Sequence, residues 1–115
     1  MIARVLTFFA LACCAAPALS HAFPEHAEPG AGATLRVSPS RVALSFSEKL
    51  EPVFSSVTVT DSSGHSVAAG ATVFGGNSMV LPLRSLGPGR YRVAWHVVSV
   101  DTHRTEGAYS FTVKP

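Results

Sequence analysis

The chain has 115 residues, 47% of them hydrophobic, with nine basic and seven acidic residues and a formal net charge of +2. This length allows a single domain, and the nearly balanced charge argues against nucleic acid as a partner. Both cysteines, Cys13 and Cys14, lie near the N-terminus inside a hydrophobic run, so the remainder of the chain can form no disulfide and offers no thiolate to a metal.

Residues 1–20 have the pattern of a cleavable signal peptide. Arg4 supplies a positive charge, and the apolar run from Val5 to Ala16 is too short to cross a bilayer. Ala18 and Ser20 are small residues at the positions that a signal peptidase reads. The sequence therefore predicts export, with residues 21–115 as the processed domain and no membrane-spanning segment left after cleavage.

The cleavage position decides which residue begins the exported chain. Cleavage after Ser20 leaves His21 first, whereas cleavage after Ala22 leaves Phe23 first. Lipidation at Cys13 is a further alternative, which the alanine-rich segment 10–12 disfavours because lipoprotein signals usually carry a larger aliphatic residue there. We take cleavage after Ser20 as the prediction.

The remainder of the chain alternates apolar and polar residues with a period of two, which is typical of strands with one buried face. The strands expected in chain order cover residues 34–37, 42–47, 56–60, 71–74, 79–83, 91–98 and 108–113. Turn-forming residues separate them at 61–64, 75–77 and 87–89.

About seven short strands predict an all-β, immunoglobulin-like β-sandwich. An up-and-down barrel is the structural alternative, but a two-sheet sandwich is easier to close in so few residues. Because no disulfide is available, we expect aromatic side chains to supply much of the core burial, namely Phe46, Phe54, Trp95, Tyr109 and Phe111.

Three residues are candidate metal ligands: His21, Asp101 and His103. Asp101 and His103 are two residues apart, so in an extended segment their side chains project from the same side. An N-terminal His21 would add two nitrogens, its α-amine and its imidazole Nδ1, an arrangement called a histidine brace. Tetragonal nitrogen and oxygen coordination suits Cu(II), whereas Cu(I) prefers thiolates and thioethers.

Several motifs occur in a fixed order along the processed chain. They are His21-Ala22-Phe23, the Pro-Gly segment 28–34, Phe46-Ser47-Glu48, the segment 89–95, Val97-Val98-Ser99, Asp101-Thr102-His103 and the segment 107–113. In this order they resemble the CopC family of periplasmic copper-binding proteins over nearly all of residues 21–115.

The resemblance implies a Greek-key sandwich in the periplasm that binds one Cu(II) per chain at His21, Asp101 and His103. Glu48 is a weaker candidate, either near the metal or orienting a ligand. Copper sequestration, resistance or delivery is the implied function, with a CopD-type inner-membrane protein as a possible recipient. We expect a monomer and no enzymatic activity.

The other histidines and the methionine content are less suggestive of ligands. His26 follows the N-terminus closely, but we expect it to be solvated in an irregular segment, and His65 to lie exposed in a turn. We expect His96 on the surface because it follows the core residue Trp95. Relatives that also bind Cu(I) carry a methionine-rich segment, whereas residues 60–82 contain only Met79, so we expect Met79 in the core and no Cu(I) site.

Two other classes of function remain open from the sequence. One is a copper-dependent oxidase or monooxygenase, since a histidine brace can activate oxygen. Asp101 disfavours it because this carboxylate would fill a position that oxygen needs. The other is a noncatalytic adhesion or assembly module, since sandwiches support many functions.

Overall fold

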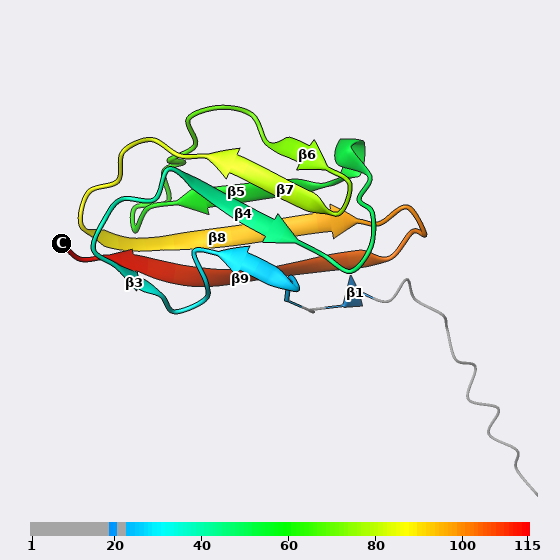
Figure 1. Cartoon of the computed structure of the whole chain (residues 1–115), viewed down its shortest axis with the longest axis horizontal. Helices are drawn as coiled ribbons and strands as arrows, with labels where there is room; N and C mark the ends of the chain where they lie inside the picture. The colour runs from blue at the N-terminus through cyan, green and yellow to red at the C-terminus, as the bar shows by residue number, and fades with distance from the viewer. Residues whose placement is uncertain (1–18, 21–22) are drawn as a thin grey trace, which may run out of the picture.

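The computed structural model describes residues 19–20 and 23–115, which form two β-sheets packed face to face (Figure 1). In the first sheet the strand order is β1 (Leu19–Ser20), β9 (Arg104–Val113), β8 (Gly89–Val98) and β5 (Ser56–Thr60), with β3 (Thr34–Leu35) also paired with β9. The second sheet has the order β2 (His26–Glu28), β4 (Arg41–Ser45), β7 (Ser78–Pro82) and β6 (Val73–Gly75).

The alternating side chains of the two sheets meet in one hydrophobic core. Every second residue of β4, β5, β7 and β8 is buried, as in β4, where Val42 and Leu44 are at most 1% exposed. In β9 the same alternation holds from Tyr109 onward. Met79 is fully buried, which confirms its predicted place in the core. Gly76 adopts a left-handed φ of 64° between β6 and β7, a conformation that glycine accepts without a steric penalty.

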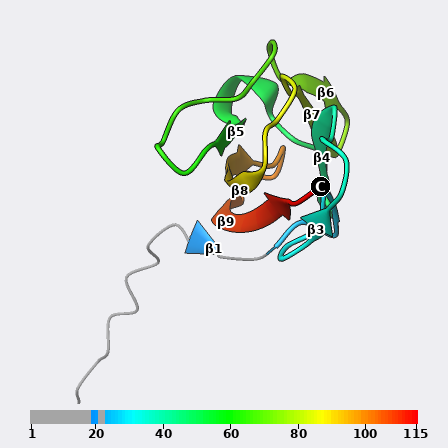
Figure 2. The same cartoon turned by 90° about the vertical axis from the view of Figure 1, so that its left-hand side faces the viewer.

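The longest strands, β8 and β9, pair antiparallel over ten residues each. The short connection between them, residues 99–103, lies at one end of the sandwich. The C-terminus and β3 lie at the other end, which Figure 2 faces. The predicted all-β sandwich is therefore confirmed. The described residues contain nine strands rather than about seven, because several pairings are only two or three residues long.

Several details of the sequence prediction were wrong. The last strand begins at Arg104 and not at residue 108, because residues 104–107 pair with β8 although they include no large apolar side chain. Phe54 is 64% exposed, because it lies on the 3₁₀ helix η1 (Pro52–Phe54) outside the sandwich instead of on an inward-facing strand position. His26 is exposed as expected, but it lies in β2 opposite Ser45 of β4 and not in an irregular segment. In residues 19–20 and 23–115 we find no helix with the length and apolar character needed to span a bilayer.

Candidate metal centre

The candidate centre is built on the tight connection between β8 and β9. The Ser99 amide donates to the His103 carbonyl at 2.9 Å, and the Thr102 amide donates to the Ser99 carbonyl, also at 2.9 Å. Thr102 has a φ of 71°, the only positive φ of a non-glycine residue in the part of the chain that the structure describes. Such a conformation is uncommon for a β-branched residue and is held by the surrounding hydrogen bonds.

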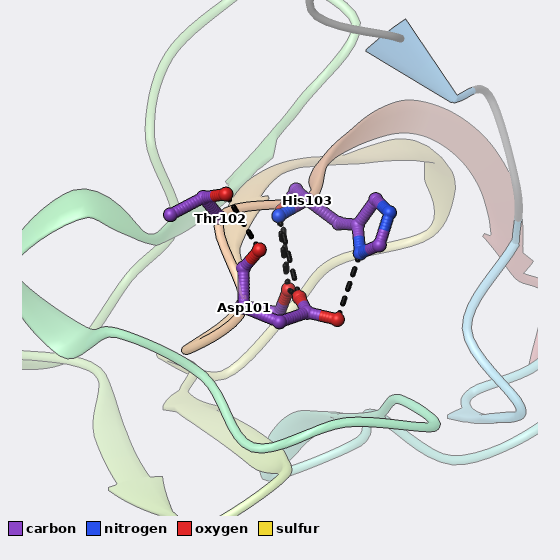
Figure 3. A network of polar contacts seen from close by, with 4 residues as sticks. Asp101, Thr102 and His103 are labelled. Atoms are coloured by element: carbon purple, nitrogen blue, oxygen red, sulfur yellow. Dashed lines mark hydrogen bonds and ion pairs between the residues drawn. The ribbon is translucent and has the colours of Figure 1, made fainter.

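This turn brings Asp101 and His103 together. The His103 amide donates to Asp101 Oδ1 at 3.3 Å, and His103 Nδ1 lies 2.8 Å from Asp101 Oδ2. Figure 3 shows the two side chains facing each other, with Thr102 pointing away. The side chains of Asp101 and His103 do lie on the same side, as predicted. The reason given for it was wrong, because the segment is a hydrogen-bonded turn and not extended backbone.

Glu48 reaches the centre from the loop that follows β4. The Leu50 amide donates to the Gly76 carbonyl at 3.0 Å, and the Val100 amide donates to the Lys49 carbonyl at 2.9 Å. The first bond holds the loop against the turn between β6 and β7, and the second docks it against the β8–β9 connection. Glu48 therefore lies beside the turn of residues 99–103, although it is far from that turn in the sequence.

Among the described residues, Glu48, Asp101 and His103 form a group that offers one carboxylate or imidazole ligand atom each, all within 4.8 Å of one another. The side chains of Asp101 and His103 are 41% and 70% exposed, so an ion from solvent has direct access to them. Two carboxylate oxygens and one imidazole nitrogen form a donor set that a divalent transition metal accepts.

The three groups perturb one another's proton affinity. Hydrogen bonds from the Glu48 carboxyl and the Ser99 hydroxyl hold the pKa of Asp101 well below its usual range. The same carboxyl-to-carboxyl hydrogen bond raises the pKa of Glu48, since a proton is retained where two negative charges would otherwise meet. The hydrogen bond and charge of Asp101 raise the pKa of His103. Glu48 and His103 therefore keep their protons to higher pH than usual, and a metal ion would compete with those protons.

Ser99 is a supporting residue that the sequence reasoning missed. It is 6% exposed, and its hydroxyl donates to Asp101 Oδ1. The Ser99 Oγ atom also accepts a hydrogen bond from the His103 amide at 3.2 Å. A serine directly after the last apolar position of a strand and two residues before an acid is a weak sequence signal. Ser99 contacts Asp101 and His103 only because the chain turns directly after it.

A cleft of about 300 Å³ opens beside the centre. Apolar and polar side chains share its lining, namely Phe23, Glu25, Phe46, Ser47, Glu48, Leu50, Val97, Ser99, His103 and Thr105. Phe23 packs on the core residue Trp95, with ring centroids 5.5 Å apart. This contact holds Phe23 in the cleft next to the candidate ligands.

The remaining predicted residues are distributed as follows. His21 lies outside the described residues. His26 does not belong to the group, and His65 is exposed in the turn after β5, where its amide donates to Asp61 Oδ1 at 3.0 Å. His96 is exposed on the outer face of β8, with Nδ1 3.1 Å from Glu106 Oε2.

Comparisons with known proteins agree with this architecture. The family model described as the CopC domain matches residues 24–114. Protein YobA of Escherichia coli is 38% identical over 83% of this chain and 80% of its own length. Copper resistance protein C of Xanthomonas campestris pv. juglandis is 36% identical over 98% of this chain and 95% of its own length.

Solved structures give the same result. The crystal structure of CopC from Methylosinus trichosporium OB3b superposes with a TM-score of 0.70 at 37% identity, covering 83% of this chain and 95% of that one. PcoC, a methionine-rich copper resistance protein from Escherichia coli, superposes with a TM-score of 0.69 at 35% identity. The match covers 83% of this chain and 100% of the PcoC chain. The domain match and these relatives show that the chain belongs to the CopC family.

Proposed function

We propose that this protein is exported to the periplasm, binds one Cu(II) ion per chain and serves in copper sequestration, resistance or delivery. The observation that carries the proposal is the convergence of Glu48, Asp101 and His103 within 4.8 Å at an exposed turn. Membership of a family that includes copper resistance proteins makes copper the metal of choice. A CopD-type inner-membrane recipient and a monomeric state rest on the resemblance alone.

His21 is the proposed fourth contributor, through its α-amine and imidazole. Phe23 lines the same cleft as Glu48 and His103. Two residues of chain reach at most about 7 Å, so in a chain that begins at His21 the amine would lie no farther than that from Phe23 and its cleft. His21 and His103 would then supply three nitrogens and Asp101 an oxygen, with Glu48 next to this set, which suits tetragonal Cu(II).

We propose no Cu(I) site in this chain. Met79 is the only methionine after Met1, and its side chain is 0% exposed within the core. A thioether in that position is unavailable to an ion from solvent. The proposal distinguishes this chain from PcoC, whose structure is described as that of a methionine-rich protein.

The test begins with the processed chain. Intact mass spectrometry of protein from a periplasmic extract is expected to give the mass of residues 21–115. Titration with Cu(II), followed by electron paramagnetic resonance, is expected to show one nitrogen-rich tetragonal signal at one equivalent. A chain that begins at Phe23 would remove the proposed N-terminal ligand and leave a weak carboxylate and imidazole site.

Two variants separate the proposed ligands from incidental copper binding. His103→Ala and a chain with one added glycine before His21 are each expected to lose at least about tenfold in Cu(II) affinity, because each removes nitrogen donors. His65→Ala is the matched control, since His65 is an exposed histidine outside the cluster. Equal losses in His103→Ala and His65→Ala would refute the assigned site.

A further inference from the structure

Four basic side chains form a row on the outer face of the first sheet, at the end opposite the candidate metal centre. Arg90 and Arg92 flank the buried Tyr91 on β8 and so both point outward. Arg90 lies opposite Thr112 of β9, two residues before Lys114. Arg36 follows β3 and lines a shallow hollow together with Lys114. We name Arg36, Arg90, Arg92 and Lys114 the basic row; all four are exposed.

No carboxylate side chain lies among the outward-facing residues of the strands around this row. Its neighbours on those strands are small hydroxyl and alanine residues, namely Thr34, Thr58, Thr60, Ala94, Ala108, Ser110 and Thr112. The outer face carries a carboxylate only towards the metal end, where Glu106 pairs with His96. Within the described residues, every ion pair uses a histidine, so the basic row has no carboxylate within 4.0 Å.

The charges of the described domain are strongly separated along its length. Two further basic residues, Arg41 and Arg84, lie at the same end as the basic row. The carboxylate side chains on that side are Asp61 and Glu28, and Glu28 lines a hollow together with Arg41. The metal end has five acidic residues, namely Glu25, Glu48, Glu51, Asp101 and Glu106, against Lys49 and Arg104. The end that Figure 2 faces is therefore positive and the opposite end negative.

The geometry points to the basic row as a docking surface for an anionic phospholipid bilayer. Arginine and lysine side chains interspersed with hydroxyl groups are donors suited to phosphate headgroups, and clustered basic residues are attracted to anionic membrane surfaces. A protein partner fits less well, because protein interfaces centre on aromatic or large apolar anchors, and the exposed large apolar residue that adjoins the row in the described chain is the single aliphatic Val37.

The charge separation also sets how the protein would lie on such a surface. Arg90 and Val98 are the second and last residues of β8, and eight residues of strand extend about 26 Å. The basic end is attracted to the bilayer while the acidic end is repelled, so the sandwich tilts with its metal turn raised. Docking thus holds the protein at the membrane and leaves the candidate metal centre open. This inference does not depend on copper binding.

The experiment is cosedimentation of residues 21–115, which include the whole core, with lipid vesicles. Vesicles of phosphatidylcholine with one quarter phosphatidylglycerol are compared with pure phosphatidylcholine at about 20 mM and about 150 mM salt, because screening weakens exposed electrostatic attraction. The protein is expected to bind only the anionic vesicles, and less at the higher salt. Equal binding to both lipids, or no binding at low salt, overturns the proposal.

Charge-matched variants locate the surface. Arg90→Gln/Arg92→Gln is expected to weaken vesicle binding at least about tenfold. Lys49→Gln/Arg104→Gln, which removes the same charge from the metal end, is expected to leave it within about threefold. If the first variant is misfolded by circular dichroism, Arg36→Gln/Lys114→Gln takes its place. Equal loss in the two kinds of variant would assign binding to net charge and refute the surface. Competition by inorganic phosphate alone at millimolar concentration would assign the row to free phosphate and likewise refute bilayer docking.

Discussion

Gly107 on β9 is the position where a single added methyl group is expected to disturb both the fold and the metal centre. It lies opposite Trp95 of β8. A Cβ at residue 107 would come within 2.5 Å of Trp95 Cζ2, 3.0 Å of Cη2 and 3.1 Å of Cε2. Carbon atoms in favourable contact are about 3.5 Å or more apart, so the indole ring would have to move by about 1 Å.

The ring has little room to make that movement. Trp95 is 3% exposed and lies between Phe23 and Tyr109, with ring centroids 5.5 Å and 5.9 Å away. Overpacking of this kind costs about 1–3 kcal/mol, and alanine recovers about 0.5–1 kcal/mol relative to glycine in a strand. A net loss of about 1–2 kcal/mol corresponds to a fall in Tm of roughly 5–15 °C for a domain of this size.

Urea and thermal unfolding of Gly107→Ala and Gly87→Ala measure the effect. Gly87 is the matched control, because a Cβ there meets no atom within 4 Å and its φ is not left-handed. We also expect weaker Cu(II) binding in Gly107→Ala, since a displaced Trp95 moves Phe23 at the cleft beside His103. Unfolding free energies of the two variants that agree within about 0.3 kcal/mol would refute the packing argument.

Three further predictions concern the core and the candidate centre. Met79→Ala is expected to lower the free energy of unfolding by about 2–5 kcal/mol in urea melts, because its side chain is fully buried. Burial raises the pKa of Tyr109 to about 12, so the stability associated with its neutral hydroxyl is present below pH 10 and lost as the pH rises towards 12. Tyr109→Phe lacks the hydrogen bond to the Pro29 carbonyl and should be less stable near neutrality, but its stability should fall less between pH 9 and 11; parallel curves would contradict this. In the metal-free protein, His103 should titrate by NMR above the usual histidine pKa of 6.5, and Asp101→Asn should move that value down; an unchanged value would contradict the ion pair.

The sequence predicted β8 and the second half of β9 well, because their side chains alternate strictly and one face of each is buried. Val93, Trp95 and Val97 on β8 are all at most 3% exposed, as the period of two requires. The pattern failed at Phe54, since hydrophobicity alone does not distinguish a core strand from the exposed 3₁₀ turn that begins at Pro52.

The candidate centre was predictable only where its residues are close in sequence. Asp101 and His103 were identified as a pair, but the left-handed Thr102 that turns them together leaves no sequence signature. The position of Glu48 depends on backbone bonds between two loops, such as that from the Val100 amide to the Lys49 carbonyl. Those bonds join a loop of one sheet to a turn of the other, a contact that the strand patterns of the sequence do not reveal.

The proposed cation site accounts for the exposed cluster better than a stabilising role in the fold does. Exposed ion pairs such as Asp101 with His103 contribute little to stability, and a second carboxylate beside the first is unfavourable unless it retains a proton. The raised pKa of Glu48 is the result of its hydrogen bond to Asp101 and of the repulsion between these neighbouring carboxylates. A divalent ion would remove that repulsion by supplying positive charge between the two carboxylates. It would also stabilise the folded chain by mass action, since the three groups converge only in the folded state.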